Sequence, residues 1–132
     1  MQPFPGMPQL LDRLGRARSL AIATGKSRRG LDRALEATRL RVHFRASRCA
    51  DETRPKPHPA MLLELMQELE VQASEVLMIG DTSHDLQMAS AAGVDAVAVS
   101  YGAHAREGLL ACGPRGCCAS VEELRQWLMQ SA

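Results

Sequence analysis

The sequence has 132 residues, of which 45% are hydrophobic and 23% charged, as in a single globular domain that can bury a core. The formal net charge is +1 and only 3% of the residues are aromatic, so neither a basic patch nor a set of stacking side chains indicates a nucleic-acid partner. No run of about 18 apolar residues occurs, and a membrane span is therefore not predicted.

Short apolar runs alternate with helical patterns through the first half of the chain. After a proline-rich lead-in at residues 3–8, leucines at helical spacing predict a helix that begins at Met7 and ends at Gly15. Residues 19–23 predict a strand, and residues 30–40 predict a helix. A weaker strand is predicted at residues 42–46, near a sheet edge, and a strongly amphipathic helix at residues 60–69.

The most informative stretch is 76–89. Its first four residues are apolar and predict a strand buried on both faces, which Gly80 ends. Residues 85–92 predict a helix. A fourth strand is predicted at 96–100, an irregular segment at 109–118, and a last helix that Ser120 caps and that runs through Met129. Because strands alternate with helices, we predict one α/β domain over residues 1–132 with a parallel sheet.

Polar residues follow several of these strands, where the carboxyl ends of parallel strands form a binding crevice. Asp81 and Asp85 are four residues apart, a spacing that can aim two carboxylates at one Mg²⁺ ion. The alternative is an ordinary helix N-cap at Thr82 or Ser83 with an acidic first turn. Thr24 adds a hydroxyl, and Lys56 adds a cation from a loop stiffened by prolines. This set suits a phosphate held beside Mg²⁺.

Other candidate groups are interpreted as structural. Lys26, Arg28 and Arg29 are typical of a solvated helix face, and His58, His84 and His104 of loop residues. The four cysteines form no CxxC pair, and no histidine follows them at zinc-finger spacing: Cys49, Cys112, Cys117 and Cys118. With no signal-peptide pattern at the N-terminus, we expect free thiols and a cytoplasmic location.

Three segments, in this order, resemble motifs of the haloacid dehalogenase superfamily, and more closely its phosphoglycolate-phosphatase-like members. Residues 21–25 resemble the second motif, whose hydroxyl hydrogen-bonds the phosphoryl group. Residues 56–59 resemble the third, whose lysine steadies the negative charge. Residues 80–85 resemble the fourth, whose first aspartate ligates Mg²⁺ and whose second supports it.

The resemblance covers nearly the whole chain. It implies a three-layer, Rossmann-like parallel sheet and a Mg²⁺-dependent phosphatase that acts on a small phosphorylated metabolite through an aspartyl-phosphate. It assigns phosphate binding to Thr24, Gly25 and Lys56, of which Thr24 and Lys56 are also catalytic. It assigns the metal to Asp81 and Asp85.

The first motif of the superfamily has no counterpart, because no Asp-x-Asp occurs in the sequence. In relatives this motif supplies the nucleophile and the general acid/base from a central strand. The chain therefore resembles a partial core that lacks this strand and the cap. Two pairs of strands, ending at Thr24 and Asp81, would face a gap. We expect that the strands close up, that another chain fills the gap, or that copies exchange strands to form a homodimer.

Two functions of different classes follow. The favoured hypothesis is a phosphatase core that is incomplete in this chain. The alternative is a non-catalytic, truncated module that acts by association or by binding an anion or a metal. A receiver-like signalling domain is a fainter possibility, since it would need an acceptor aspartate on an earlier strand and none is found there.

Overall fold

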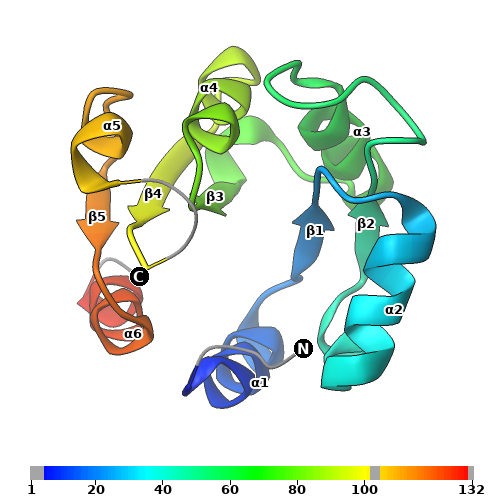
Figure 1. The fold of residues 1–132 in the computed structure, drawn as a ribbon, viewed down its shortest axis with the longest axis horizontal. Helices are drawn as coiled ribbons and strands as arrows, with labels where there is room; N and C mark the ends of the chain where they lie inside the picture. Colours follow the sequence, from blue (N-terminus) through cyan, green and yellow to red (C-terminus); the bar gives the residue numbers. More distant parts are fainter. Residues whose placement is uncertain (1–4, 102–104, 131–132) are drawn as a thin grey trace.

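The computed structural model describes residues 5–101 and 105–130, so the lead-in and the loop at 101–104 fall partly outside it, as does His104. Figure 1 shows the helices α1 (Met7–Ala17), α2 (Arg28–Thr38), α3 (Ala60–Leu69), α4 (Ser83–Ala91), α5 (Arg106–Leu110) and α6 (Val121–Gln130). The strands are β1 (Ala21–Ala23), β2 (Ala46–Arg48), β3 (Leu77–Gly80), β4 (Asp95–Val99) and β5 (Gly116–Cys118). None of the helices in the described ranges is long and apolar enough to cross a membrane.

The strands form two parallel sheets. In the first sheet β1 pairs with β2, and in the second the order is β3-β4-β5. β1 lies between β2 and β3 in Figure 1, but no pairing joins β1 to β3 within the described residues. The predicted α/β class with an incomplete parallel sheet is confirmed. The two facing strands have not closed up, and the other two predicted outcomes, which need a second chain, stay predictions.

Helices cover both faces of the sheets and complete three layers, with α1, α2 and α6 on one side and α3, α4 and α5 on the other (Figure 1). One core cluster joins α3, α4 and α5 to Ala96 and Ala98 of β4. A second joins α1 and α6 to Val97 and Val99 of the same strand. A third, smaller cluster packs α2 on Ile22 of β1. The alternation of side chains along β4 therefore serves both layers.

Burial shows that β4, and not β3, is the strand enclosed on both faces. The last four residues of β4 are all buried, whereas Ile79 of β3 is 38% exposed. The prediction of full burial for residues 76–79 is wrong because the free edge of β3 has no neighbouring strand to extend the layers across it.

Two further expectations are corrected. The strand predicted at 42–46 begins later, because Arg41–His43 forms a 3₁₀ turn in which Val42 is 86% exposed. The segment 109–118, predicted to be irregular, contains the end of α5 and the strand β5. β5 is too short for a periodic signal, and its Gly116 admits Trp127, whose Nε1 would lie 2.5 Å from a Cβ at that position.

Candidate functional site

The turn from β3 into α4 is built around Asp85. Thr82 is the N-cap of α4, and its hydroxyl accepts a hydrogen bond from the Asp85 amide at 3.1 Å. In return, Asp85 Oδ2 accepts from the amides of Asp81 and Thr82, each at 3.1 Å. The N-cap considered at Thr82 is thus present, and the second aspartate is part of the capping box.

Gly80 makes this arrangement possible. A Cβ at residue 80 would lie 2.3 Å from Asp85 Cβ and 2.9 Å from its Cγ. Real Cβ atoms do not approach other carbons so closely, so any larger residue would displace Asp85. The glycine that ends β3 is therefore required for the buried carboxylate to lie against the strand.

Lys56 completes the group with an ion pair from its Nζ to Asp85 Oδ1. The Lys56 side chain is 17% exposed and that of Asp85 3%. One ammonium group and two backbone amides contact this buried carboxylate and compensate for its removal from water. Because both of its oxygens are engaged, Asp85 holds Lys56 in place at the carboxyl end of β3.

Thr24 and Gly25 lie at the carboxyl end of the other sheet. The Thr24 amide donates to the carbonyl oxygen of Arg48, and the Thr24 hydroxyl accepts from the Lys26 amide, both at 3.1 Å. Gly25 is exposed, and a Cβ there would meet no described atom within 4 Å. Space within the chain therefore does not require glycine at position 25, and its predicted role toward a ligand stays a prediction.

The structure thus brings Lys56, Asp81 and Asp85 into one contact group, whereas Thr24 and Gly25 belong to the sheet on the other side of the gap between β1 and β3. Sequence reasoning missed Tyr101, which follows β4. Burial, with smaller contributions from Cys118 and the Asp81 carboxylate, raises the pKa of Tyr101 to about 12. A neutral phenol therefore stands close to the Asp81 charge.

The residues at hand do not form a complete magnesium site. Within the described ranges, no group of three or more His, Cys, Asp or Glu side chains could hold a metal ion. Mg²⁺ takes six oxygen ligands, of which waters and substrate phosphates are common members beside one or two carboxylates. Both oxygens of Asp85 are already hydrogen-bonded, and the assignment of Asp81 and Asp85 as magnesium ligands stays a prediction.

Arg28 is the second group that the sequence did not reveal, since it was interpreted as part of a solvated face. Its guanidinium pairs with Glu52 and lowers the pKa of that carboxyl to about 2. The two residues are 24 positions apart, and neither stands in a recognisable pattern. No signal short of a contact map could have paired them.

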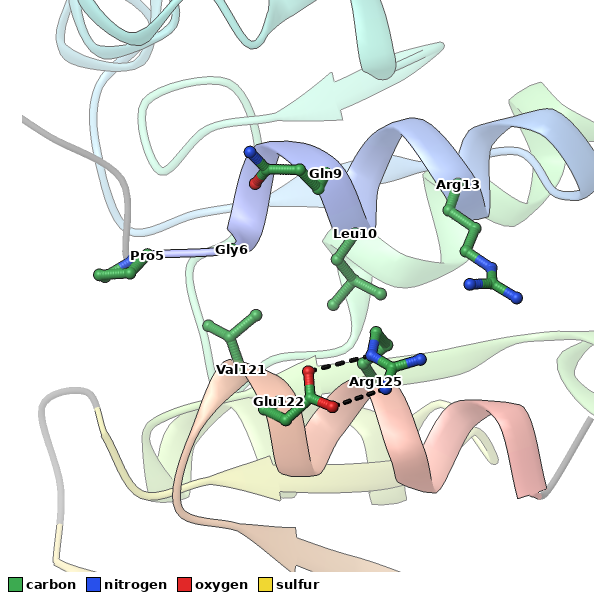
Figure 2. A pocket seen from close by; sticks show the side chains of 8 residues that line it. All are labelled: Pro5, Gly6, Gln9, Leu10, Arg13, Val121, Glu122 and Arg125. Atoms are coloured by element: carbon green, nitrogen blue, oxygen red, sulfur yellow. Dashed lines mark hydrogen bonds and ion pairs between the residues drawn. The ribbon is translucent and has the colours of Figure 1, made fainter.

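A cavity of about 270 Å³ lies away from these residues, between α1 and α6 (Figure 2). Leu10 and Val121 form its apolar part, and the ion pair of Glu122 with Arg125 lies at its edge. None of the predicted site residues lines the cavity. Its lining residues are Pro5, Gly6, Gln9, Leu10, Arg13, Val121, Glu122 and Arg125. The cavity is thus in the layer opposite to α4.

Comparison with known proteins gives consistent results. Residues 1–99 match the family described as haloacid dehalogenase-like hydrolase. The chain is 40% identical over 114 residues to "Probable phosphatase IndB" of Dickeya dadantii, covering 85% of this chain and 50% of that protein. It is 41% identical over 69 residues to the phosphoglycolate phosphatase of Colwellia psychrerythraea, covering 52% of this chain and 30% of that protein.

A solved structure agrees with the fold. A haloacid dehalogenase-like family hydrolase from Streptococcus pneumoniae superposes with a TM-score of 0.87 at 21% identity, over 96% of this chain and 60% of that one. These two matches cover most of this chain but only about half of each relative. The chain thus spans about half the length of these relatives. Because the family model matches three quarters of its residues, the chain belongs to the haloacid dehalogenase-like hydrolase family.

Proposed function

We propose that this chain is the phosphate-binding part of a cytoplasmic, Mg²⁺-dependent phosphomonoesterase whose substrate is a small phosphorylated metabolite. The observation that carries the proposal is the buried Lys56–Asp85 pair at the carboxyl end of β3. A lysine held there by a carboxylate of the α4 capping box is a fixed positive charge at the edge where α/β sheets bind ligands. The name of the phosphoglycolate phosphatase that the chain resembles supports a small substrate.

Two donors of this chain would bind the phosphoryl group. The Lys56 ammonium has three donors, and its described partner, Asp85, takes one of them. The Thr24 hydroxyl oxygen accepts a hydrogen bond from the Lys26 amide. The hydroxyl proton of Thr24 therefore points away from this amide and can be donated to another group. Bound Mg²⁺ would neutralise phosphoryl charge, and Asp81 is the ligand that we assign to this chain. The remaining protein ligands of the Mg²⁺ ion would come from outside the described residues.

The nucleophile that forms an aspartyl-phosphate would come from a strand seated between β1 and β3. The free edge of β3 and the half-exposed residues of β1 support this position, since backbone groups at sheet edges require partners. The strand would belong to the rest of a longer protein, to another chain, or to a second copy in a homodimer. The span of about half the matched relatives favours the first of these.

Phosphate release from an aryl phosphate, measured with and without Mg²⁺, tests the proposal. We expect Mg²⁺-dependent turnover wherever the missing strand is supplied, and its loss in Asp81→Asn. Mg²⁺-independent release, or release that survives Asp81→Asn, would contradict the assignment of Asp81.

The second candidate is the non-catalytic module. It is favoured by the absence of Asp-x-Asp from the sequence and of a metal-binding group of side chains from the described residues. Such a module would bind inorganic phosphate or Mg²⁺ without turnover, even with the missing strand present. Turnover in the completed core would exclude it.

A further inference from the structure

We propose that Arg28 is a positioning residue. Through Glu52 it fixes the turn that carries Thr24 relative to the loop that carries Lys56, and so sets the distance between two groups that address the same phosphate. This inference rests on the proposed phosphate site and adds to it a residue that lies outside the matched motifs.

Besides an Nη1–Oδ1 distance of 3.6 Å to Asp32 of α2, the Arg28 guanidinium contacts strand β2 and the loop that follows it. Its Nε donates to Glu52 Oε2 at 3.0 Å and its Nη2 to Glu52 Oε1 at 2.8 Å, a two-pronged pair. Its Nη1 donates to the Ser47 hydroxyl at 2.8 Å, and Nη2 also reaches the Ser47 carbonyl oxygen at 3.3 Å. The side chain is only 33% exposed. A planar fork used in this way fixes orientation as well as charge.

The backbone on both sides of Arg28 extends the same connection. The Arg28 amide donates to Asp51 Oδ1 at 2.9 Å, and the Ala50 amide donates to the Lys26 carbonyl oxygen at 2.9 Å. Together with the Thr24 amide on the Arg48 carbonyl oxygen, these bonds continue the β1–β2 pairing beyond the strands. The turn after β1 and the loop after β2 are therefore joined as one unit.

The same loop leads directly to Lys56. Glu52, which also accepts from the Cys49 amide at 2.9 Å, precedes Lys56 by four residues. Thr53, which lies between Glu52 and Lys56, donates a hydrogen bond to Glu64 of α3. Arg48 Nε of β2 donates to the same glutamate, with 3.0 Å between Nε and Oε1. The loop is thus fixed to α2 by Arg28 and to α3 by Glu64. Misplacement by about 1 Å of a group that binds substrate can cost about a hundredfold in rate, so this fixation matters for the ligand.

Arg28→Lys tests the inference because it keeps the charge and loses the fork. We expect the affinity for inorganic phosphate to fall about tenfold. We also expect faster hydrogen exchange at the amides of Cys49 and Ala50, which bond Glu52 and Lys26. Arg125→Lys is the matched control, since Arg125 makes the same two-pronged pair with Glu122 on α6. It should leave both readouts unchanged.

The two proposals fail in distinguishable ways. If the wild-type protein and its completed core bind no phosphate, the proposed function fails, and exchange at Ala50 still reports on the loop. If phosphate binds and Arg28→Lys leaves both affinity and exchange at wild-type values, Arg28 is not a positioning residue. The losses from Arg28→Lys and Glu52→Gln should be less than additive when the two are combined, because the substitutions share the Arg28–Glu52 contact; fully additive losses would also overturn the inference.

Discussion

Gly80→Ala is the substitution whose effect can be worked out most fully from the structure. The added methyl carbon would lie 2.3 Å from Asp85 Cβ and 2.9 Å from Asp85 Oδ2, so the carboxylate must move. Asp85 would then lose the hydrogen bonds that it accepts from two backbone amides, and also its contact with Lys56. A lost helix cap costs about 1 kcal/mol, and lost hydrogen bonds to a buried charge cost about 2–3 kcal/mol.

Because alanine suits a strand better than glycine by about 0.5–1 kcal/mol, the net loss should be about 2–3 kcal/mol of unfolding free energy. Urea unfolding followed by circular dichroism measures it. Gly108→Ala is the matched control, since a Cβ there meets no described atom within 4 Å and α5 should gain up to about 1 kcal/mol. A Gly80→Ala protein within about 0.5 kcal/mol of wild type would refute the geometry at Asp85.

Three more predictions follow from other contacts. Lys56→Met should cost about 2–4 kcal/mol of unfolding free energy, since it leaves the buried Asp85 charge without its cation; no loss in urea unfolding would contradict the ion pair. The pKa of Glu52 is about 2 in the folded state against an ordinary 4.5, so the stability it contributes is complete above about pH 5 and is lost as the pH falls toward 2. The difference in unfolding free energy between wild type and Glu52→Gln should therefore shrink over this range, and a constant difference would count against the prediction. Gly116→Ala should cost about 1–3 kcal/mol and change the fluorescence of Trp127, the single tryptophan, against which the new methyl group would press; unchanged emission and stability would contradict that contact.

The parts of the site that could be predicted are those written in consecutive residues. The turn from Gly80 to Asp85 carries its strand end, its cap and its carboxylates within six positions, and local chemistry fixes such a turn. Lys56 could be placed because the prolines around it mark a stiff loop. The prediction of Asp85 as a metal ligand stays untested, but its hydrogen bonds favour the supporting role.

The parts that could not be predicted depend on distant contacts. The pairing of Arg28 with Glu52 joins two loops that only the β1–β2 pairing brings together. The strand β5 is stabilised by its register with β4, from Val97 opposite Gly116 to Val99 opposite Cys118, and not by a pattern of its own. The exposure of Ile79 follows from the empty edge beside β3, which no property of residues 76–79 indicates.

Phosphate release by a completed core tests the central claim most directly. The part of the Dickeya dadantii relative that this chain does not match would be fused ahead of this chain. Release of phosphate from an aryl phosphate would then be measured with Mg²⁺. We predict turnover that Lys56→Met and Asp81→Asn each abolish and that Arg125→Lys leaves unchanged. A folded fusion that binds Mg²⁺ but releases no phosphate, or turnover that survives Lys56→Met, would contradict the claim that this chain supplies the phosphate-binding half of the site.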